Sequence, residues 1–140
     1  MRATVEWRGG DTFVGGEVEF DAELTPMKTL LLAFGGCGGI SVIDLLRKMR
    51  QDVTAYQLHL TAEQRDAHPR VFTKIHLEHV VTGRALDSGK VHRAVELSAH
   101  YCPVGATLRL AAEVTETVNV IQEDVPPSPS PGGRGSAKRG

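Results

Sequence analysis

The sequence lacks an excess of charge of either sign. Sixteen Lys and Arg residues oppose 17 Asp and Glu residues among the 140 residues, which leaves a formal net charge of −1 at pH 7. Nucleic acids and anionic membranes are bound by basic faces or basic tails, and this composition supplies no such excess. We therefore expect neither nucleic acid nor membrane as a partner.

Long apolar segments are also missing. No uncharged run approaches the roughly 18 apolar residues that identify a membrane-spanning helix. Residues 1–6 do not resemble the apolar centre of a secretory signal peptide. Both observations predict a cytoplasmic protein.

Cysteine is scarce, since the chain contains two, Cys37 and Cys102. In a reducing cytosol such a pair is more often a pair of free thiols or a transient catalytic disulfide than a permanent crosslink. Free cysteine can also serve simply as a small buried hydrophobic residue. Both interpretations are open for both thiols.

Glycine, in contrast, is concentrated around Cys37, at positions 35, 36, 38 and 39. The surrounding apolar residues repeat at helical spacing, and a glycine inside a helix costs roughly 1 kcal/mol relative to alanine. Without Cβ atoms at these positions, another backbone, a second subunit or a small oxidant can approach the sulfur closely. The cluster therefore indicates a two-thiol redox site, tight helix packing at a dimer interface, or both.

The folded domain is predicted over residues 1–121, and its order of elements is that of an α+β domain. Alternating apolar and polar residues predict three short strands within residues 3–21. Thr25 and Pro26 form a helix-start signal, and the apolar periodicity continues that helix to about residue 51. Residues 122–140 are rich in Pro, Gly and Ser and predict a disordered tail.

The second half of the domain is predicted to contain a hairpin, a helix and a strand. Residues 53–62 and 71–81 alternate with period two and predict an antiparallel hairpin that packs against the long helix. Asp87 is a plausible cap for a second helix, which Cys102 ends because a proline follows. After a short helical turn, residues 113–120 predict a closing strand.

Three segments of the chain together carry a family signature: residues 25–37, residues 68–73 and residues 94–102. In their order and residue types they resemble the OsmC/Ohr-like family, named for osmotically inducible protein C and organic hydroperoxide resistance protein. The resemblance covers almost all of residues 1–121. It implies an OsmC-like fold, in which antiparallel sheets pack on two long central helices of an intertwined homodimer, with active sites at the subunit interface.

The resemblance also implies a thiol-dependent peroxidase that protects against oxidative and osmotic stress. In the family's cycle Cys37 is the peroxidatic thiol and Cys102 the resolving thiol. A sulfenic acid forms on Cys37 when an organic hydroperoxide is reduced, and Cys102 condenses with it to a disulfide. A dithiol such as a lipoyl group then restores the thiols, and neither a cofactor nor a metal is expected.

The sequence departs from the family at the group that activates the first thiol. The peroxidases of the family carry a glutamate directly after the proline, bonded to an arginine, whereas this chain has Met27 there. An unperturbed cysteine has a pKa near 8.5, so the site needs a group that stabilises the thiolate. The candidate activating cations are Arg8 and Lys28. The alternative function is a non-catalytic or redox-sensing member of the fold that binds a small molecule.

Histidine is present six times, which raises the question of a metal site. His76 and His79 lie three residues apart in one predicted strand, so they point to opposite faces of a sheet and do not share an ion. His79 falls on the apolar face of that strand. It is predicted to be a hydrogen-bonded histidine of the core or of an interface.

Overall fold

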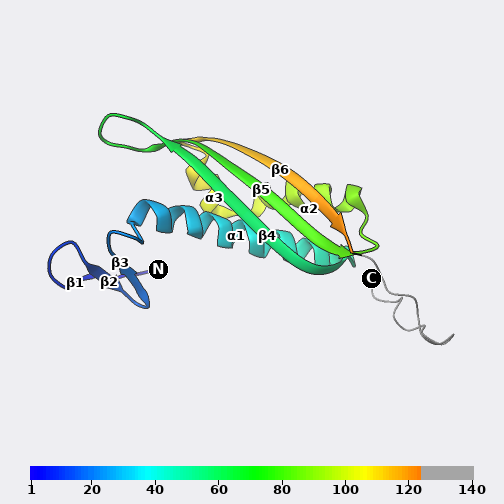
Figure 1. Ribbon diagram of the computed structural model, residues 1–140, viewed down its shortest axis with the longest axis horizontal. Coiled ribbons are helices and arrows are strands. Elements are labelled where there is room, and N and C mark those ends of the chain that lie inside the picture. Colours follow the sequence, from blue (N-terminus) through cyan, green and yellow to red (C-terminus); the bar gives the residue numbers. More distant parts are fainter. Residues whose placement is uncertain (124–140) are drawn as a thin grey trace. The chain divides into compact units, whose positions relative to one another are not determined.

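In the computed structural model, residues 1–123 are described, and the chain divides into two compact units, Met1–Ala33 and Phe34–Gly140. The boundary falls inside the long helix α1 (Pro26–Lys48), whose residues belong to both units. From residue 124 onward, the predicted tail lies outside the described residues. Figure 1 labels the elements along the chain.

The first unit contains a three-stranded antiparallel sheet, as the sequence predicts. Its strands are β1 (Glu6–Trp7), β2 (Phe13–Gly15) and β3 (Val18–Phe20). Gly9 and Gly10 have φ angles of 100° and 53° in the turn between β1 and β2, a backbone that glycine adopts without strain. The Trp7 indole N–H closes this turn by donating to the Gly10 carbonyl at 2.9 Å.

The predicted start of α1 is confirmed. The Thr25 hydroxyl accepts the Lys28 N–H at 3.2 Å and so satisfies one of the free donors at the helix start. The helix ends before Arg50, whose φ of 59° turns the chain out of the helix. In the second unit one face of α1 is buried through Phe34, Gly38, Val42 and Leu46.

Helix α1 is long and apolar enough to cross a membrane. This differs from the expectation that no segment of the chain has that property. This property is weak evidence for a membrane protein, because the core helix of a soluble domain passes the same test. Phe34, Val42 and Leu46 are almost fully buried in the second unit. Of the most apolar stretch of the helix, 22% is buried, so burial does not by itself identify α1 as a core helix.

The second unit contains a three-stranded sheet in the order β4, β5, β6. Strands β4 (Asp52–Gln64) and β5 (Phe72–Arg84) form the predicted antiparallel hairpin. Strand β6 (Glu113–Gln122) pairs with β5 in parallel, so the expectation of purely antiparallel sheets is wrong. A parallel pair needs a long crossover, and the helical segment between β5 and β6 supplies one.

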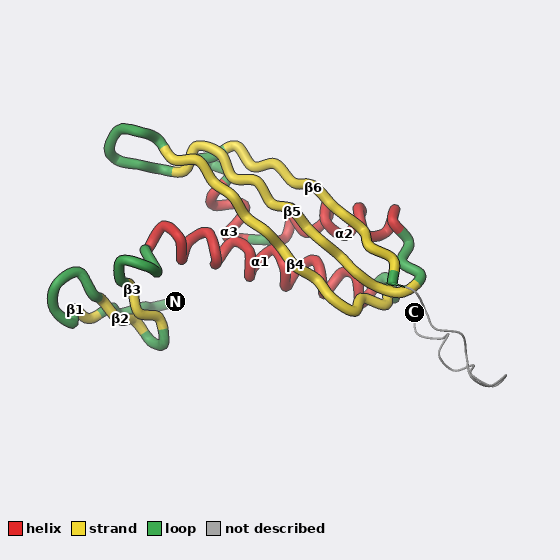
Figure 2. Tube along the Cα trace, viewed as in Figure 1, coloured by secondary structure: helices red, strands yellow, loops and turns green. Residues whose placement is uncertain are grey.

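That crossover consists of α2 (Ser88–Tyr101) and α3 (Pro103–Leu108). Asp87 caps α2 as predicted, because its carboxylate accepts the Lys90 N–H at 3.2 Å. Figure 2 shows the helices of this unit along one face of the sheet. The core lies between these layers and is formed by Val42, Leu46, Val81, Leu86, Val91, Ala94 and Val95.

Candidate functional site

The two cysteines lie next to each other in the second unit. Cys37 belongs to α1 and Cys102 to the corner between α2 and α3, and both are free thiols. The Cys37 thiol is near enough to raise the pKa of the Cys102 thiol. Cys102 is only 3% exposed, whereas Cys37 is half-buried. The fold thus pairs one accessible sulfur with one buried sulfur.

Local chemistry explains how Cys102 reaches this position. Pro103 disfavours helical backbone at the residue before it, and Cys102 is extended, with φ −80° and ψ 106°. The residue therefore ends α2 and also begins α3. Its N–H donates to the Ser98 carbonyl at 3.0 Å, and its Sγ accepts the Gly105 N–H at 3.3 Å.

The surroundings of Cys102 favour its protonated form. Burial raises the pKa of this thiol, and the neighbouring Cys37 raises it further. The backbone N–H groups of Gly105 and Val104 act in the opposite direction, but the pKa remains above its ordinary value. Burial thus favours the protonated thiol at Cys102, whereas Cys37 is the more exposed of the two.

Close packing keeps α3 against α1 at this point. A Cβ atom added at Gly105 would lie 2.8 Å from Cε1 of Phe34 and 3.4 Å from Sγ of Cys102. Carbon atoms almost never approach to 2.8 Å without a bond, so only glycine fits here without a shift of the neighbours. This glycine lets the helix that Cys102 starts come into contact with the helix that carries Cys37.

The glycines around Cys37 have different surroundings. A Cβ at Gly35 would lie 2.8 Å from Leu60, so this glycine permits close approach of β4, as the sequence suggests. At Gly36 and Gly38 an added Cβ would meet no atom of the described chain within 4 Å. The cluster therefore serves tight packing inside the subunit on one side and leaves open space on another.

A groove of about 620 Å³ runs along α1 beside these glycines. Its wall on β4 is formed by Tyr56 and Leu58. The α1 side is formed by Gly35, Gly36, Gly39, Ile40, Ser41, Ile43, Asp44 and Arg47. Ile40 is 74% exposed, so a large apolar side chain borders the groove without a partner in the described chain.

A polar cluster around the buried His79 lies on the sheet and reaches the end of α3. We call it the His79 network, formed by Tyr56, His79, Glu116 and Arg109. The Tyr56 hydroxyl lies 2.7 Å from Nδ1 of His79, and Nε2 of His79 lies 2.7 Å from Oε1 of Glu116. Arg109 donates from Nη2 to Oε2 of Glu116 at 3.1 Å. His79 is 1% exposed, which confirms its prediction as a hydrogen-bonded core histidine.

The pKa of Tyr56 indicates the protonation state of one member of the His79 network. Burial, and then the charge of Glu116, raise the pKa of Tyr56, so its hydroxyl stays protonated. Nε2 of His79 donates to the carboxylate of Glu116, which can only accept, and Nδ1 is hydrogen-bonded to the Tyr56 hydroxyl. The carboxylate of Glu116 thus accepts from a histidine on one oxygen and an arginine on the other.

Sequence reasoning missed three members of the His79 network. A buried role for Glu116 could have been predicted from the sequence, because Glu116 occupies the inward position between Val114 and Val118 in an alternating strand. A carboxylate on an otherwise apolar face predicts a buried partner. Tyr56 and Arg109 carried no comparable signal, since their meeting depends on how β4 and α3 are placed in the fold.

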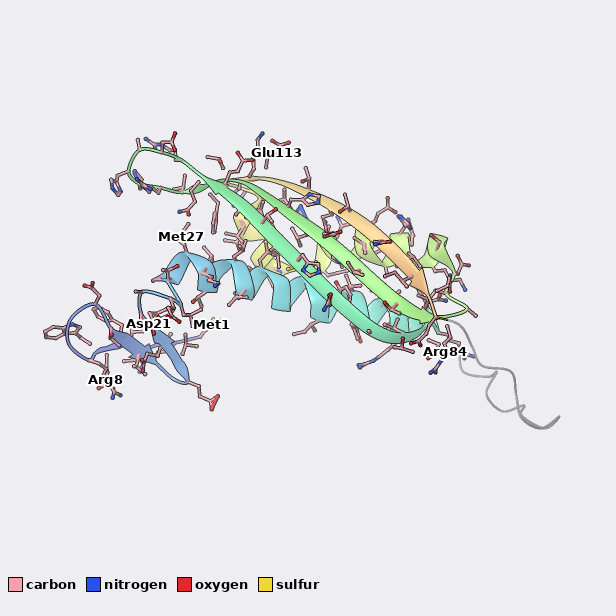
Figure 3. The ribbon with its side chains drawn as sticks, in the orientation of Figure 1. Met1, Arg8, Asp21, Met27, Arg84 and Glu113 are labelled. Carbon is pink, nitrogen blue, oxygen red and sulfur yellow. The ribbon has the colours of Figure 1, made fainter. Side chains whose placement is uncertain are left out.

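The two candidate activating cations lie in the first unit. Arg8 is exposed in the turn after β1 and pairs with Glu6 at 3.8 Å, and Lys28 lies in the first turn of α1. Figure 3 labels Arg8 and also Met27, at the start of α1. In residues 34–123 no cation is hydrogen-bonded to either thiol. The role of Arg8 and of Lys28 in activation stays a prediction.

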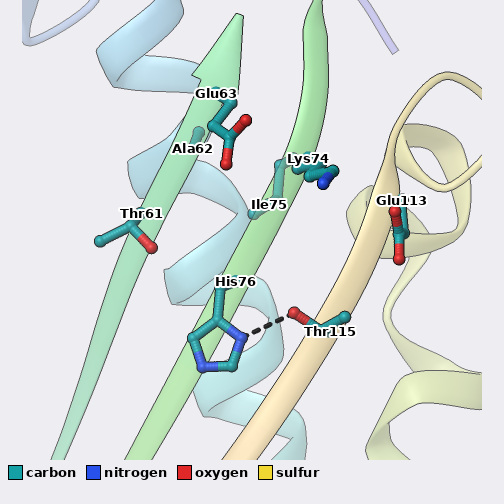
Figure 4. Close-up of a pocket in the computed structure, with 8 residues that line it drawn as sticks. All are labelled: Thr61, Ala62, Glu63, Lys74, Ile75, His76, Glu113 and Thr115. Atoms are coloured by element: carbon teal, nitrogen blue, oxygen red, sulfur yellow. Dashed lines mark hydrogen bonds between the residues drawn. The ribbon is translucent and has the colours of Figure 1, made fainter.

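A second hollow, of about 420 Å³, lies on the sheet face opposite the helices (Figure 4). His76 lies there, hydrogen-bonded to the Thr115 hydroxyl at 2.6 Å and to the Thr117 hydroxyl at 3.1 Å. The remaining charged residues of the hollow are Glu63, Lys74 and Glu113. No metal-binding group of His, Cys, Asp and Glu occurs within residues 1–123. This surface is a solvated polar sheet face.

Known proteins resemble this chain over most of its length. A family model described as OsmC-like protein matches residues 19–117. Protein YhfA of Escherichia coli strain K12 is 40% identical over 132 residues, which cover 86% of this chain and 98% of YhfA.

Solved structures have the same fold. A hypothetical protein from Aquifex aeolicus VF5 has a TM-score of 0.83 and 27% identity, over 88% of this chain and 97% of that one. The organic hydroperoxide resistance protein OhrB of Bacillus subtilis has a TM-score of 0.63 and 16% identity, over 85% of this chain and 98% of OhrB. At that low identity the likeness to OhrB concerns the fold.

Proposed function

The chain belongs to the family of OsmC-like proteins, and on this basis we propose that it is a thiol-dependent peroxidase that reduces organic hydroperoxides. The observation that carries the proposal is the pairing of Cys37 with Cys102. The two sulfurs come from distant parts of the chain, lie near enough for Cys37 to raise the pKa of Cys102, and differ in exposure. This is the arrangement that a peroxidatic thiol and a resolving thiol require.

The first step takes place at Cys37, the more accessible sulfur. Its thiolate attacks one oxygen of the hydroperoxide, and the O–O bond breaks. The sulfur is oxidised to a sulfenic acid, and the other oxygen takes up a proton and leaves as the alcohol. The open space beside the exposed Gly36 leaves room for an organic substituent near the thiol.

The second step uses Cys102. Its sulfur attacks the sulfenic sulfur of Cys37, the S–O bond breaks, and hydroxide leaves as water after taking up a proton. A dithiol such as a lipoyl group then reduces the disulfide by two thiol exchanges and becomes a disulfide itself.

The proposal includes a homodimer that acts in the cytoplasm in defence against oxidative and osmotic stress. The groove along α1 supports the dimer, since it is lined by glycines and bordered by the 74% exposed Ile40. A second copy would cover this apolar surface, which monomeric proteins rarely leave open. Arg8 and Lys28 are the proposed sources of the cation that stabilises the Cys37 thiolate.

Steady-state turnover tests the proposal. Purified protein is mixed with cumene hydroperoxide and dihydrolipoamide, and peroxide consumption is compared with that of the Cys37→Ser and Cys102→Ser variants. We expect turnover by the unmodified chain, none by Cys37→Ser, and inactivation of Cys102→Ser within a few cycles as Cys37 over-oxidises. Equal consumption by the unmodified chain and Cys37→Ser would refute the peroxidase.

A second candidate function is a redox-sensing or small-molecule-binding member of the fold. It is favoured by Met27, which stands where the family's peroxidases have an activating glutamate. Such a protein would form the Cys37–Cys102 disulfide once per molecule but would not turn over with dihydrolipoamide. A single stoichiometric oxidation without catalysis would therefore select this function over the first.

A further inference from the structure

Helix α3 connects the thiol site to the His79 network. Cys102 is the residue before its first turn and Arg109 the residue after its last, and only the six residues Pro103–Leu108 lie between them. The Arg109 N–H donates to the Gly105 carbonyl at 2.9 Å, and Gly105 in turn donates to Sγ of Cys102 at 3.3 Å. The position of Arg109 is therefore coupled to the position of the Cys102 sulfur through one short helix.

The far end of α3 is held by partly buried hydrogen bonds. Arg109 donates to Glu116 at 3.1 Å, and the second carboxylate oxygen of Glu116 is 2.7 Å from His79. His79 is held on its other nitrogen by Tyr56 at 2.7 Å. The Nε of Arg109 is buried and lacks a hydrogen-bond partner among residues 1–123. In the described chain, Glu116 is thus the side chain that fixes the guanidinium.

We propose that the His79 network is a positioning device for the resolving step: through Arg109 it holds α3 so that Cys102 stays directed at Cys37. The chemistry of that step rests on the proposed peroxidase function. Cys102 attacks the sulfenic sulfur of Cys37, the S–O bond breaks, and the hydroxide leaves as water. None of the four residues of the network touches the reacting sulfurs, so they act on geometry and not on the chemical step itself.

The positioning is needed because Cys37 sulfenic acid has two fates. It reacts with Cys102 to give the disulfide, or it meets a second hydroperoxide and becomes sulfinic acid, with the hydroperoxide reduced to its alcohol. A loosened α3 lowers the fraction of time for which Cys102 faces Cys37. The rate of the first oxidation of Cys37 is then unchanged. The fraction of Cys37 that becomes sulfinic acid rises, and the fraction that forms the disulfide falls.

The test compares Arg109→Gln with Arg84→Gln as a matched control. Arg84 is also paired with carboxylates, Asp52 at 3.8 Å and Glu123 at 3.6 Å, and is also partly exposed, but it ends β5 and lies outside the His79 network. Single-turnover reaction with cumene hydroperoxide is followed by dimedone trapping and mass spectrometry. Arg109→Gln should keep the rate of sulfenic acid formation, slow disulfide formation at least tenfold, and increase sulfinic acid at Cys37.

Two further variants separate positioning from general destabilisation. Arg109→Lys retains a cation and should recover part of the disulfide rate, and Tyr56→Phe removes one hydroxyl at the far end of the network with little change of volume. If Arg109→Gln does not fold, the rates of disulfide formation in Arg109→Lys and Tyr56→Phe are compared with that of the unmodified chain. Disulfide rates within twofold of the unmodified chain in all folded variants, or equal slowing of both oxidation steps, would overturn the proposal.

A peroxide-independent measurement distinguishes failure of this inference from failure of the proposed function. In glutathione redox buffers, Cys37 forms a mixed disulfide with glutathione, and Cys102 displaces the glutathione thiol to give the internal disulfide. The effective molarity of Cys102 toward Cys37 is obtained from that equilibrium. Arg109→Gln should lower it about tenfold while Arg84→Gln leaves it unchanged, whether or not the protein reduces hydroperoxides. An unchanged value in Arg109→Gln contradicts the positioning role.

Discussion

Replacing Gly105 by alanine tests how tightly α3 packs beside the thiol pair. The new Cβ would lie 2.8 Å from Cε1 of Phe34 and 3.4 Å from both Cζ of Phe34 and Sγ of Cys102. Phe34 is 2% exposed, so its ring has no free space into which it can turn. The substitution should therefore displace α3 and the sulfur that it carries.

The expected change in stability is the difference of two terms. Overpacking of a buried site costs about 1–3 kcal/mol. Alanine gains at most about 1 kcal/mol over glycine in a helix, because it loses less backbone entropy on folding. The free energy of unfolding should therefore decrease by about 1 kcal/mol in Gly105→Ala, measured by urea denaturation of the reduced protein.

A double-mutant cycle with Phe34→Leu tests whether the contact with Phe34 causes the destabilisation in Gly105→Ala. The smaller leucine leaves room for the Cβ, so Gly105→Ala should be less destabilising in the Phe34→Leu background, with a coupling of roughly 0.5–3 kcal/mol. If Gly105→Ala instead stabilises the protein by its helix propensity, or if the two substitutions are additive, the close packing of α3 against α1 is refuted.

Three more predictions concern the cap of α2, the His79 network and the groove. Asp87→Ala removes the acceptor for the Lys90 N–H and should lower the free energy of unfolding by about 1 kcal/mol; no change in the urea midpoint would argue against the cap. Tyr56 has a pKa raised above its ordinary value of 10.0, so above about pH 10 the unfolded chain loses this proton before the folded chain does. Stability should therefore fall as the pH rises beyond 10, less steeply in Tyr56→Phe, and identical slopes would exclude burial of this hydroxyl. Gly36→Ala adds a Cβ that meets nothing in the described chain; in a dimer that packs on the groove it should weaken association at least tenfold by sedimentation equilibrium, whereas an unchanged association constant places the interface elsewhere.

Much of the fold could be predicted because its signals are local. Thr25 caps α1 through a hydrogen bond to a residue three positions away, and Asp87 does the same for α2. Pro103 acts on its direct neighbour by restricting the backbone of Cys102. Interactions over such short distances leave their mark in neighbouring residue types, so the sequence identifies the helix starts and the corner that carries the second thiol.

The direction of β6 could not be predicted in the same way. Alternation in residues 113–120 identifies a strand but contains no information on its partner or its direction. The parallel pairing with β5 results from where α2 and α3 return the chain. The course of that crossover depends on packing of the whole unit and not on residues next to β6.

The candidate site contains some features that local sequence signals predict and others that depend on the packing of the whole unit. The glycine cluster and the two cysteines indicated a two-thiol redox site, and the family resemblance assigned the peroxidatic and resolving roles. The separation of the cysteines in the chain does not by itself determine their distance in space. His79 was identified as a core histidine because it lies on the apolar face of its strand. Its link to Arg109 through Glu116 was not foreseen, because it joins a strand to the end of a short helix.

The most direct test of the account is to treat the reduced protein with one equivalent of cumene hydroperoxide and to analyse it by mass spectrometry without reduction. The account predicts an internal disulfide between Cys37 and Cys102, one equivalent of cumyl alcohol for each disulfide, and neither product in Cys37→Ser. Retention of both thiols in the presence of unreacted hydroperoxide would contradict it.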